Sequence, residues 1–346
     1  MRNRIKAVAV MAFLALTVSS CAASGRETVY ASTTWHMDTY YSYTLYGKGG
    51  ETVYADLESI VSDGENVFDC YSPDSEITSV NSAVGGEEIP ISEELFRVLE
   101  ASLNGYRASE GAFDPTVGAL TELWGFGTED PHVPSETELQ EVLPCVDGSR
   151  IQLSVQDGNY SLTKGKGQKL DLGGIAKGYV LSLMKARLQD SGLDSAVISA
   201  GGNVLLYGER EFTVGIRRPE KDALDPVCAF LLKDCVISTT GSYERFFVED
   251  GVTYSHILDP RTGESVTGDG MASLSVICDD PTEADLLSTS YYVMGMERAV
   301  EAMKAGDITA VVLTSDGRIL CSAVLADHLK EDSLAEEWEL EVVGNE

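Results

Sequence analysis

The sequence predicts an α+β fold that begins near Trp35. Strand-like and helical segments follow one another without the strict alternation of a doubly wound fold, and hairpin-like pieces such as Ile151 to Leu170 intervene. The chain is 43% apolar and has no low-complexity tract. About 300 residues follow the N-terminal segment, enough for one large domain or two closely packed lobes.

The clearer strand-like segments combine β-branched residues with alternating polarity. They are Tyr41 to Tyr46, Ile151 to Val155, Ser195 to Leu206, Phe212 to Ile216, Ala272 to Ile277 and Ile308 to Thr314. The clearer helices lie between them, over Glu51 to Asn66, Ser92 to Glu110, Ser135 to Leu143, Gly174 to Ser191, Glu283 to Gly295 and Met296 to Ala305. Ser135 and Glu138 form a capping-box pattern. Residues 331–346 are expected to be a peripheral acidic tail.

The first 20 residues have the order of a lipoprotein signal peptide. Three basic residues precede an apolar run from Ala7 to Val18, and two serines lead directly to Cys21. The run is shorter than the roughly 20 residues that span a bilayer, which favours cleavage over a permanent anchor. We expect a lipid on Cys21, a tether over residues 21–34, and a location on the extracytoplasmic face of the cell membrane. The alternative is an ordinary signal peptide with an incidental cysteine.

Net charge and motif content exclude several classes of protein. The formal charge is −31, and loss of the three basic residues of the signal makes it −34, so nucleic acid and anionic lipid are excluded as partners. The other six cysteines contain no C-x-x-C pair and do not indicate a zinc site. Export permits disulfides, but several of these cysteines lie in apolar runs, where a buried free thiol is the commoner explanation, and no pairing is predicted. The chain lacks the motifs of P-loop enzymes, zincins and serine hydrolases.

Three short motifs can carry phosphate and proton chemistry. In the segment from Asp171 to Tyr179, two glycines and Lys177 at a helix start can hold a phosphate, although a plain glycine turn is an equal alternative. His256 ends an apolar strand before a turn, where it can act as a general base or be structural. Asp285 and Thr289 share one helical face and could bind Mg²⁺, or simply support their own helix.

A fourth motif, Ala112-Phe113-Asp114 with the aromatic residues that follow it, can cover a flat ring system or belong to the core. Taken together and in this order, the motifs resemble the ApbE family, the FAD:protein FMN transferases. The resemblance covers about residues 35 to 325 in eight blocks: Met37 to Thr39, Phe68 to Asn81, Ala112 to Thr116, Asp171 to Tyr179, Ala200 to Asn203, Ser238 to Glu244, His256 to Gly263 and Ala284 to Thr289.

The resemblance implies a T-fold-related α+β structure of mixed sheets with packed helices and an FAD cleft between two lobes, over residues 35–330. It also implies an enzyme that splits FAD at its pyrophosphate in a Mg²⁺-dependent reaction. FMN is attached to a threonine hydroxyl of an acceptor flavoprotein and AMP is released. The expected acceptors are subunits of membrane redox complexes or exported flavoproteins with an exposed threonine motif.

Residue roles are implied by the same resemblance. FAD contacts are expected at Met37, Tyr71, Ala112, Phe113, Asp114, Asp171, Lys177 and Ile257. Magnesium ligands are expected at Asp285, Thr289 and the Gly174 carbonyl, with Ser288 included beside them. His256 matches the histidine thought to deprotonate the acceptor threonine.

Several positions depart from the family pattern. Asp38 stands where glycine is common, and a carboxylate near a flavin pyrophosphate is unfavourable unless it points away. Ser182 stands where an aspartate often follows the lysine block. Two other functions stay open: an FAD pyrophosphatase, with water in place of threonine, and a lipid-anchored FAD-binding protein. Tyr71 favours transfer, because the transferases carry tyrosine there.

Overall fold

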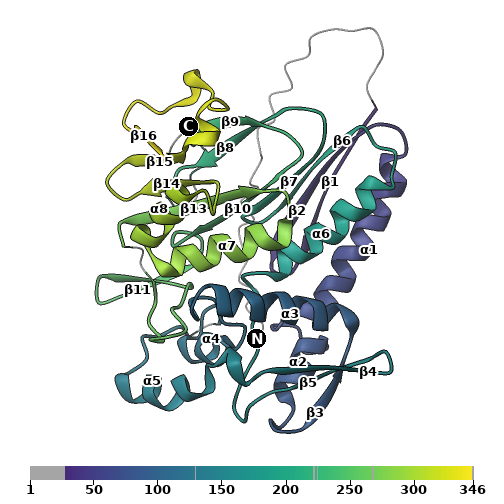
Figure 1. The fold of residues 1–346 in the computed structure, drawn as a ribbon, viewed down its shortest axis with the longest axis vertical. Coiled ribbons are helices and arrows are strands. Elements are labelled where there is room, and N and C mark those ends of the chain that lie inside the picture. Colours follow the sequence, from purple (N-terminus) through teal and green to yellow (C-terminus); the bar gives the residue numbers. More distant parts are fainter. Residues whose placement is uncertain (1–27, 129, 221–222, 224, 267–268, 345–346) are drawn as a thin grey trace, which may run out of the picture.

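In the computed structural model shown in Figure 1, the described residues are 28–128, 130–220, 223, 225–266 and 269–344. The expected signal peptide and Cys21 lie outside this range. Within it, no helix is both long and apolar enough to cross a bilayer. The cysteines of the described part are all unpaired, as the sequence suggested.

A nine-stranded sheet forms the upper part of the molecule (Figure 1). In spatial order its strands are β1 (Val29–His36), β2 (Thr39–Tyr46), β6 (Ser195–Ala200), β7 (Asn203–Gly208), β10 (Val236–Gly241), β13 (Met271–Cys278), β14 (Ala310–Thr314), β15 (Arg318–Ser322) and β16 (Glu339–Val343). Neighbouring strands are antiparallel except β15 and β16, which are parallel. The predicted α+β class is confirmed.

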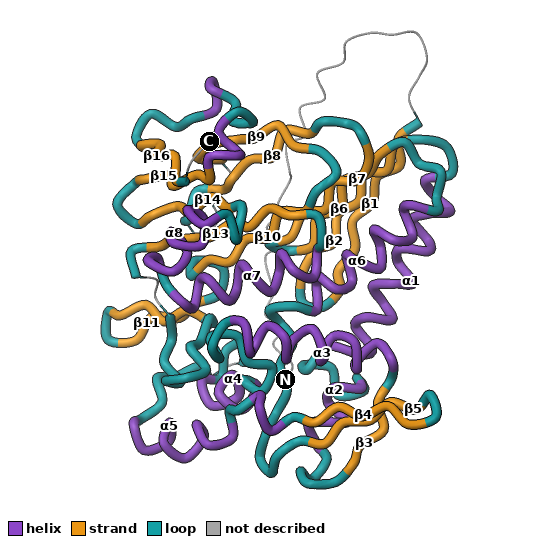
Figure 2. Tube along the Cα trace, viewed as in Figure 1, coloured by secondary structure: helices purple, strands orange, loops and turns teal. Residues whose placement is uncertain are grey.

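Helices cover one face of this sheet (Figure 2). They are α1 (Gly50–Phe68), α6 (Ala176–Gln189), α7 (Pro281–Met294) and α8 (Met296–Ala305). The hairpin of β8 (Phe212–Arg217) and β9 (Pro226–Leu232) packs on the other face, where its Phe230 joins Val197 and Leu206 in an apolar cluster. Alternate residues of the strands therefore supply two separate cores.

A second, smaller lobe lies below the sheet (Figure 1). It contains α2 (Glu76–Ser82), α3 (Glu93–Ala108), α4 (Gly118–Trp124), α5 (Glu136–Val142), and a three-stranded sheet of β3 (Glu88–Ile91), β5 (Asn159–Thr163) and β4 (Gln152–Gln156). Leu95 and Leu162 of this lobe belong to the same apolar cluster as Tyr41 and Leu181 of the large sheet and its helices. The two lobes therefore share one core, as expected for closely packed lobes.

Short elements complete the chain. The hairpin of β11 (Phe246–Glu249) and β12 (Val252–Ser255) packs its aromatic rings against Trp124 and Phe126. The remaining elements are α9 (Ala323–Ala326) and the 3₁₀ turns Leu143–Cys145, Gly148–Arg150 and Glu331–Ser333.

All the predicted helices are present, and the capping box of Ser135 and Glu138 is formed at the start of α5. The predicted strand from Ser195 to Leu206 is instead the hairpin of β6 and β7, which turns at Gly201 with a φ of 62°. Glycine is the residue that adopts this left-handed conformation at little cost.

The predicted boundaries at both ends of the folded body are wrong. Strand β1 begins at Val29, inside the expected tether, and pairs with β2 along its whole length. The expected tail contains β16, which pairs with β15 and buries Val343. Both strands lie at edges of the sheet and are rich in polar or acidic residues, which hides their alternation.

Helices α6 and α7 approach each other closely at Gly178. A Cβ atom at this position would lie 2.3 Å from the Pro281 carbonyl oxygen and 2.6 Å from Asp285 Cβ. Such distances cannot be tolerated, so only glycine permits this packing. The amide of Gly178 donates a 2.9 Å hydrogen bond to Asp285 Oδ2.

Replacing Gly178 with alanine should therefore force the two helices apart. We expect Gly178→Ala to lower the free energy of unfolding by about 1–3 kcal/mol, as overpacking does in other cores. Urea unfolding followed by circular dichroism measures the change. Gln189→Ala, on the exposed face of the same helix, is the control, with an expected change within about 0.5 kcal/mol. A Gly178→Ala protein as stable as the wild type would contradict this account.

Candidate active site

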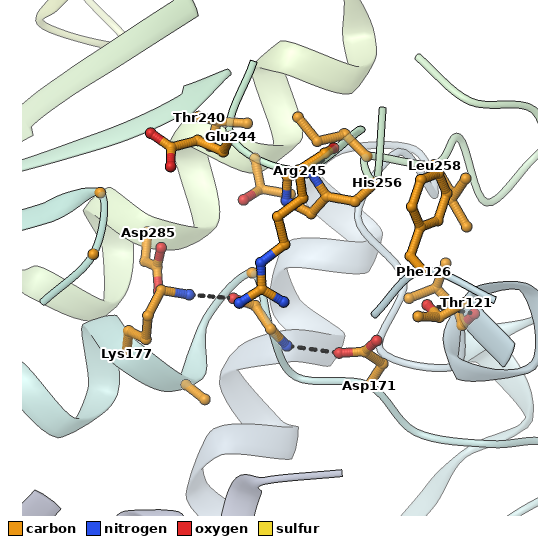
Figure 3. Close-up of a pocket in the computed structure, with 18 of the residues that line it drawn as sticks. Thr121, Phe126, Asp171, Lys177, Thr240, Glu244, Arg245, His256, Leu258 and Asp285 are labelled. Carbon is orange, nitrogen blue, oxygen red and sulfur yellow. Dashed lines mark hydrogen bonds between the residues drawn. The ribbon is translucent and has the colours of Figure 1, made fainter. Parts of the chain in front are cut away.

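A cavity of about 320 Å³ opens where the two lobes meet (Figure 3). Its walls come from the β1–β2 turn, the end of α1, the loop before α4, the start of α6, one face of α7 and the segments around β11 and β12. Most of the predicted site residues line it: Met37, Tyr71, Ala112, Phe113, Asp114, Asp171, Gly174, Lys177, His256, Ile257, Asp285 and Thr289. Residues as far apart in the sequence as Met37 and Thr289 thus face one space.

The turn between β1 and β2 forms one edge of the cavity. Met37 and Asp38 both have positive φ values, 48° and 58°, as a two-residue type I′ hairpin requires. Glu65 of α1 holds this turn, because its carboxylate accepts a 2.8 Å hydrogen bond from the Met37 amide. Asp38 is ion-paired with Arg245, at 2.7 Å from Oδ2 to Nη2. The guanidinium offsets the negative charge that would otherwise repel a pyrophosphate.

The segment before α6 folds back on itself at the cavity wall. The Gly173 amide donates to Asp171 Oδ1 at 2.9 Å, and Lys177 Nζ donates to the Gly173 carbonyl at 2.7 Å (Figure 3). The Gly178 amide in the first turn of α6 is already occupied by Asp285. A phosphate at this end of α6 would therefore rely on Lys177 and on the other groups of the loop.

Three oxygen donors gather where α6 and α7 meet. Asp285, Thr289 and Gly174 all line the cavity, and a Cβ at Gly174 would lie 3.1 Å from Thr289 Oγ1. One carboxylate, one hydroxyl and one carbonyl are hard oxygen ligands of the kind Mg²⁺ takes while keeping waters and phosphate oxygens. In the described part of the chain, no cluster of three or more histidine, cysteine or acidic residues could hold a metal ion.

Ser288 does not face the cavity, which corrects its expected place among the metal ligands. It is fully buried and is not among the residues that line the cavity. Its hydroxyl lies 3.0 Å from Ser238 Oγ and 3.0 Å from Thr240 Oγ1 and donates to the Asp285 carbonyl. These partners on β10 show that Ser288 fixes α7 on the sheet.

His256 follows β12 directly and is half-buried in the cavity wall. Its Nδ1 lies 3.1 Å from the Arg245 carbonyl oxygen, and its main-chain amide donates to the same oxygen at 3.0 Å. A carbonyl can only accept, so Nδ1 carries the proton and Nε2 keeps a lone pair. Burial, together with the positive charges of Arg245 and Lys177, lowers the pKa of His256 to about 4. The ring is neutral at pH 7.

Apolar and aromatic groups form the remaining wall. Phe113, Phe126 and Leu258 are buried and line the cavity, and Phe126 stacks on Trp124. The Asp114 side chain joins its own loop to the 3₁₀ turn Gly148–Arg150, because its oxygens accept hydrogen bonds from Thr116 and from the Gly148 amide. A flat ring system has a suitable surface on this side.

Sequence reasoning assigned no role to Glu65 or Arg245, which fix the β1–β2 turn from two sides. It also gave no role to Asn203. The Oδ1 of this residue accepts a hydrogen bond from the Ser238 hydroxyl, while its buried Nδ2 has no hydrogen-bond partner. Arg245 directly follows the block from Ser238 to Glu244, and that adjacency was the available signal. Glu65 lies on a helix with no distinguishing pattern.

Comparison with known proteins shows which family the chain belongs to. A sequence profile of the ApbE family matches residues 37–312. The FAD:protein FMN transferase of Treponema pallidum is 30% identical over 93% of this chain and 95% of its own length. The crystal structure of an ApbE protein from Thermotoga maritima is similar with a TM-score of 0.79 and 29% identity, over 88% of this chain and all of that one. The flavin transferase ApbE from Vibrio cholerae has a TM-score of 0.76 and 26% identity, over 87% and 99% of the two chains. The chain belongs to the ApbE family.

Proposed function

We propose that this protein is an FAD:protein FMN transferase that moves FMN from FAD to a threonine hydroxyl of an acceptor flavoprotein and releases AMP. One observation carries the proposal: a neutral imidazole, a lysine and a group of hard oxygen donors line a single cavity with an aromatic wall. The curated relatives named FAD:protein FMN transferase support the same reaction.

The transfer breaks the phosphoanhydride bond of the FAD pyrophosphate and forms a phosphoester bond to the acceptor. The acceptor hydroxyl oxygen attacks the FMN phosphorus, and the bond from that phosphorus to the bridging oxygen of the pyrophosphate breaks, so the electron pair leaves with AMP. Nε2 of His256 takes the hydroxyl proton. Lys177 neutralises charge that builds on the phosphate oxygens.

Magnesium belongs to this proposal. Asp285, Thr289 and the Gly174 carbonyl would hold the ion, which supplies charge neutralisation at the phosphate oxygens when bound. Asp285 gives the ion its only protein charge, while its hydrogen bond from Gly178 keeps the carboxylate in place.

The location follows from the N-terminus. We place the protein on the extracytoplasmic face of the cell membrane, anchored by a lipid on Cys21. The acceptors are then flavoproteins exposed on that side, either membrane redox subunits or exported proteins.

Intact-mass measurement tests the reaction. The mature protein is incubated with FAD, Mg²⁺ and an acceptor flavoprotein domain that carries an exposed threonine. Addition of one FMN to the acceptor, matched by AMP, is the expected result. Free FMN and AMP without labelling would indicate a pyrophosphatase, and intact FAD would indicate a binding protein, so either overturns the proposal.

His256→Gln should lower the labelling rate about 10²- to 10⁴-fold, the usual contribution of a general base. FAD binding, followed by quenching of flavin fluorescence, should be retained. His132→Gln is the matched control, because His132 is exposed and outside the cavity lining. Labelling by His256→Gln at the wild-type rate would remove the histidine from the mechanism.

The pH profile should show the lowered pKa of His256. The base works only when neutral, so activity is lost as pH falls through the pKa of the ring. We expect the acid limb of kcat/KM near pH 4 rather than 6.5, with secondary structure monitored at each pH. Lys177→Gln removes a nearby positive charge and should move the limb to higher pH. A limb at 6.5 in the wild type would be inconsistent with this environment.

Asp285→Asn should weaken the apparent affinity for Mg²⁺ about 10- to 100-fold, because the ligand charge is lost. The side-chain oxygen of asparagine can still accept a hydrogen bond from the Gly178 amide. The free energy of unfolding of Asp285→Asn should therefore be closer to that of the wild type than the free energy of unfolding of Asp285→Ala. Glu283→Gln, an exposed acid on the same helix, should leave Mg²⁺ dependence unchanged. An unchanged Mg²⁺ titration for Asp285→Asn would contradict the assignment.

A further inference from the structure

An ion pair joins two sides of the cavity mouth that lie 207 residues apart in sequence. Arg245 Nη2 lies 2.7 Å from Asp38 Oδ2 and donates to the Asp38 carbonyl at 3.2 Å. Asp38 belongs to the β1–β2 turn, and Arg245 immediately precedes β11. Both residues line the cavity, and Figure 3 shows Arg245 beside His256 in its wall.

The main chain of Arg245 also holds His256. Its carbonyl oxygen accepts from both the amide and Nδ1 of that histidine. Arg245 is thus attached to Asp38 through its guanidinium and to the proposed base through its backbone. Any displacement of Arg245 would move the carbonyl that fixes the orientation and tautomer of the ring.

Residues 242–245, which carry Arg245, form a turn between β10 and β11, outside the ladders of the sheet. Two ion pairs hold side chains of this turn, Glu244 with Arg217 and Arg245 with Asp38, and the Arg217 guanidinium also lies over the Tyr243 ring. Of these contacts, only the pair with Asp38 joins the turn to the β1–β2 side of the cavity. The side chains of Asp38 and Arg245 are 55% and 42% exposed. Exposed ion pairs add little to the free energy of unfolding. We therefore consider the effect of the Asp38–Arg245 pair on the position of Arg245.

Asp38 is suited to this task by its backbone. At a φ of 58° most residues are strained, while aspartate and asparagine tolerate the left-handed conformation. Glycine would fit the turn but offer no charge. Aspartate accepts the conformation and gives Arg245 a partner.

We propose that the Asp38–Arg245 ion pair is a positioning pair for His256, which holds the Arg245 carbonyl where it keeps the proton on Nδ1 and leaves Nε2 free as the base. The role rests on the proposed function, in which His256 deprotonates the acceptor hydroxyl. Asp38 and Arg245 act through the histidine and not on the reacting atoms.

Asp38→Asn tests the proposal, because asparagine keeps the size and the backbone tolerance of aspartate and removes only the charge. We expect kcat for acceptor labelling to fall about tenfold, as small misplacements of catalytic groups do, while the Kd for FAD stays within about twofold. Asp38→Glu, which restores the charge, should recover part of kcat. The ¹⁵N signals of the His256 ring should show loss of the single Nδ1–H tautomer in Asp38→Asn and its partial return in Asp38→Glu.

Arg217→Gln is the matched control. It removes two contacts from the same turn, the ion pair with Glu244 and the guanidinium over the Tyr243 ring, and Arg217 is outside the cavity lining. The His256 tautomer should be unchanged in this variant. An equal loss of the tautomer in Arg217→Gln would show general loosening of the turn and overturn the specific role of Asp38.

Two other outcomes would also overturn it. A tighter Kd for FAD with unchanged kcat in Asp38→Asn would mean that Asp38 competes with substrate phosphates for Arg245. A reduced kcat with unaltered His256 ring signals would place the effect elsewhere. The tautomer measurement needs no turnover: if it changes as expected while the wild type labels no acceptor, the positioning pair stands and the proposed transfer fails.

Discussion

The close contact of α6 and α7 at Gly178 is the constraint on which the candidate site depends. Because Gly178 has no side chain, Asp285 can approach the first turn of α6 and accept a hydrogen bond from the Gly178 amide. The same crossing has Gly174 beside Thr289 and Lys177 at the cavity wall. The donors proposed for the metal and the phosphate are therefore brought together by one helix crossing.

The chain is strongly acidic, yet its cavity is proposed to accept a dinucleotide with two phosphates. The structure limits this repulsion by giving several cavity carboxylates partners. Asp38 pairs with Arg245, the oxygens of Asp114 accept hydrogen bonds from Thr116 and from the Gly148 amide, and Asp285 caps α6. A divalent cation at Asp285 would complete the compensation, which is why a Mg²⁺-dependent reaction suits this protein.

Sequence patterns predicted the helices and the motif-bearing loops because their signals are local. The capping box at Ser135 and the glycines before Lys177 each specify a conformation within a few residues. The edge strands β1 and β16 were missed because solvent faces them and polar side chains interrupt their alternation. Arg245 and Ser288 gained their roles from partners more than 40 residues away, at Asp38 and Ser238, which no local pattern encodes.

The low pKa of His256 makes the basicity of its ring sensitive to a substrate bound in the cavity. An imidazole with a pKa near 4 is neutral but weakly basic, and part of the lowering comes from the charges of Arg245 and Lys177. A pyrophosphate bound beside Lys177 would offset those positive charges and raise the pKa of the ring toward its usual range. The histidine would then become a stronger base when FAD is in place, and proton removal from the acceptor would be favoured only in the complex that can use it.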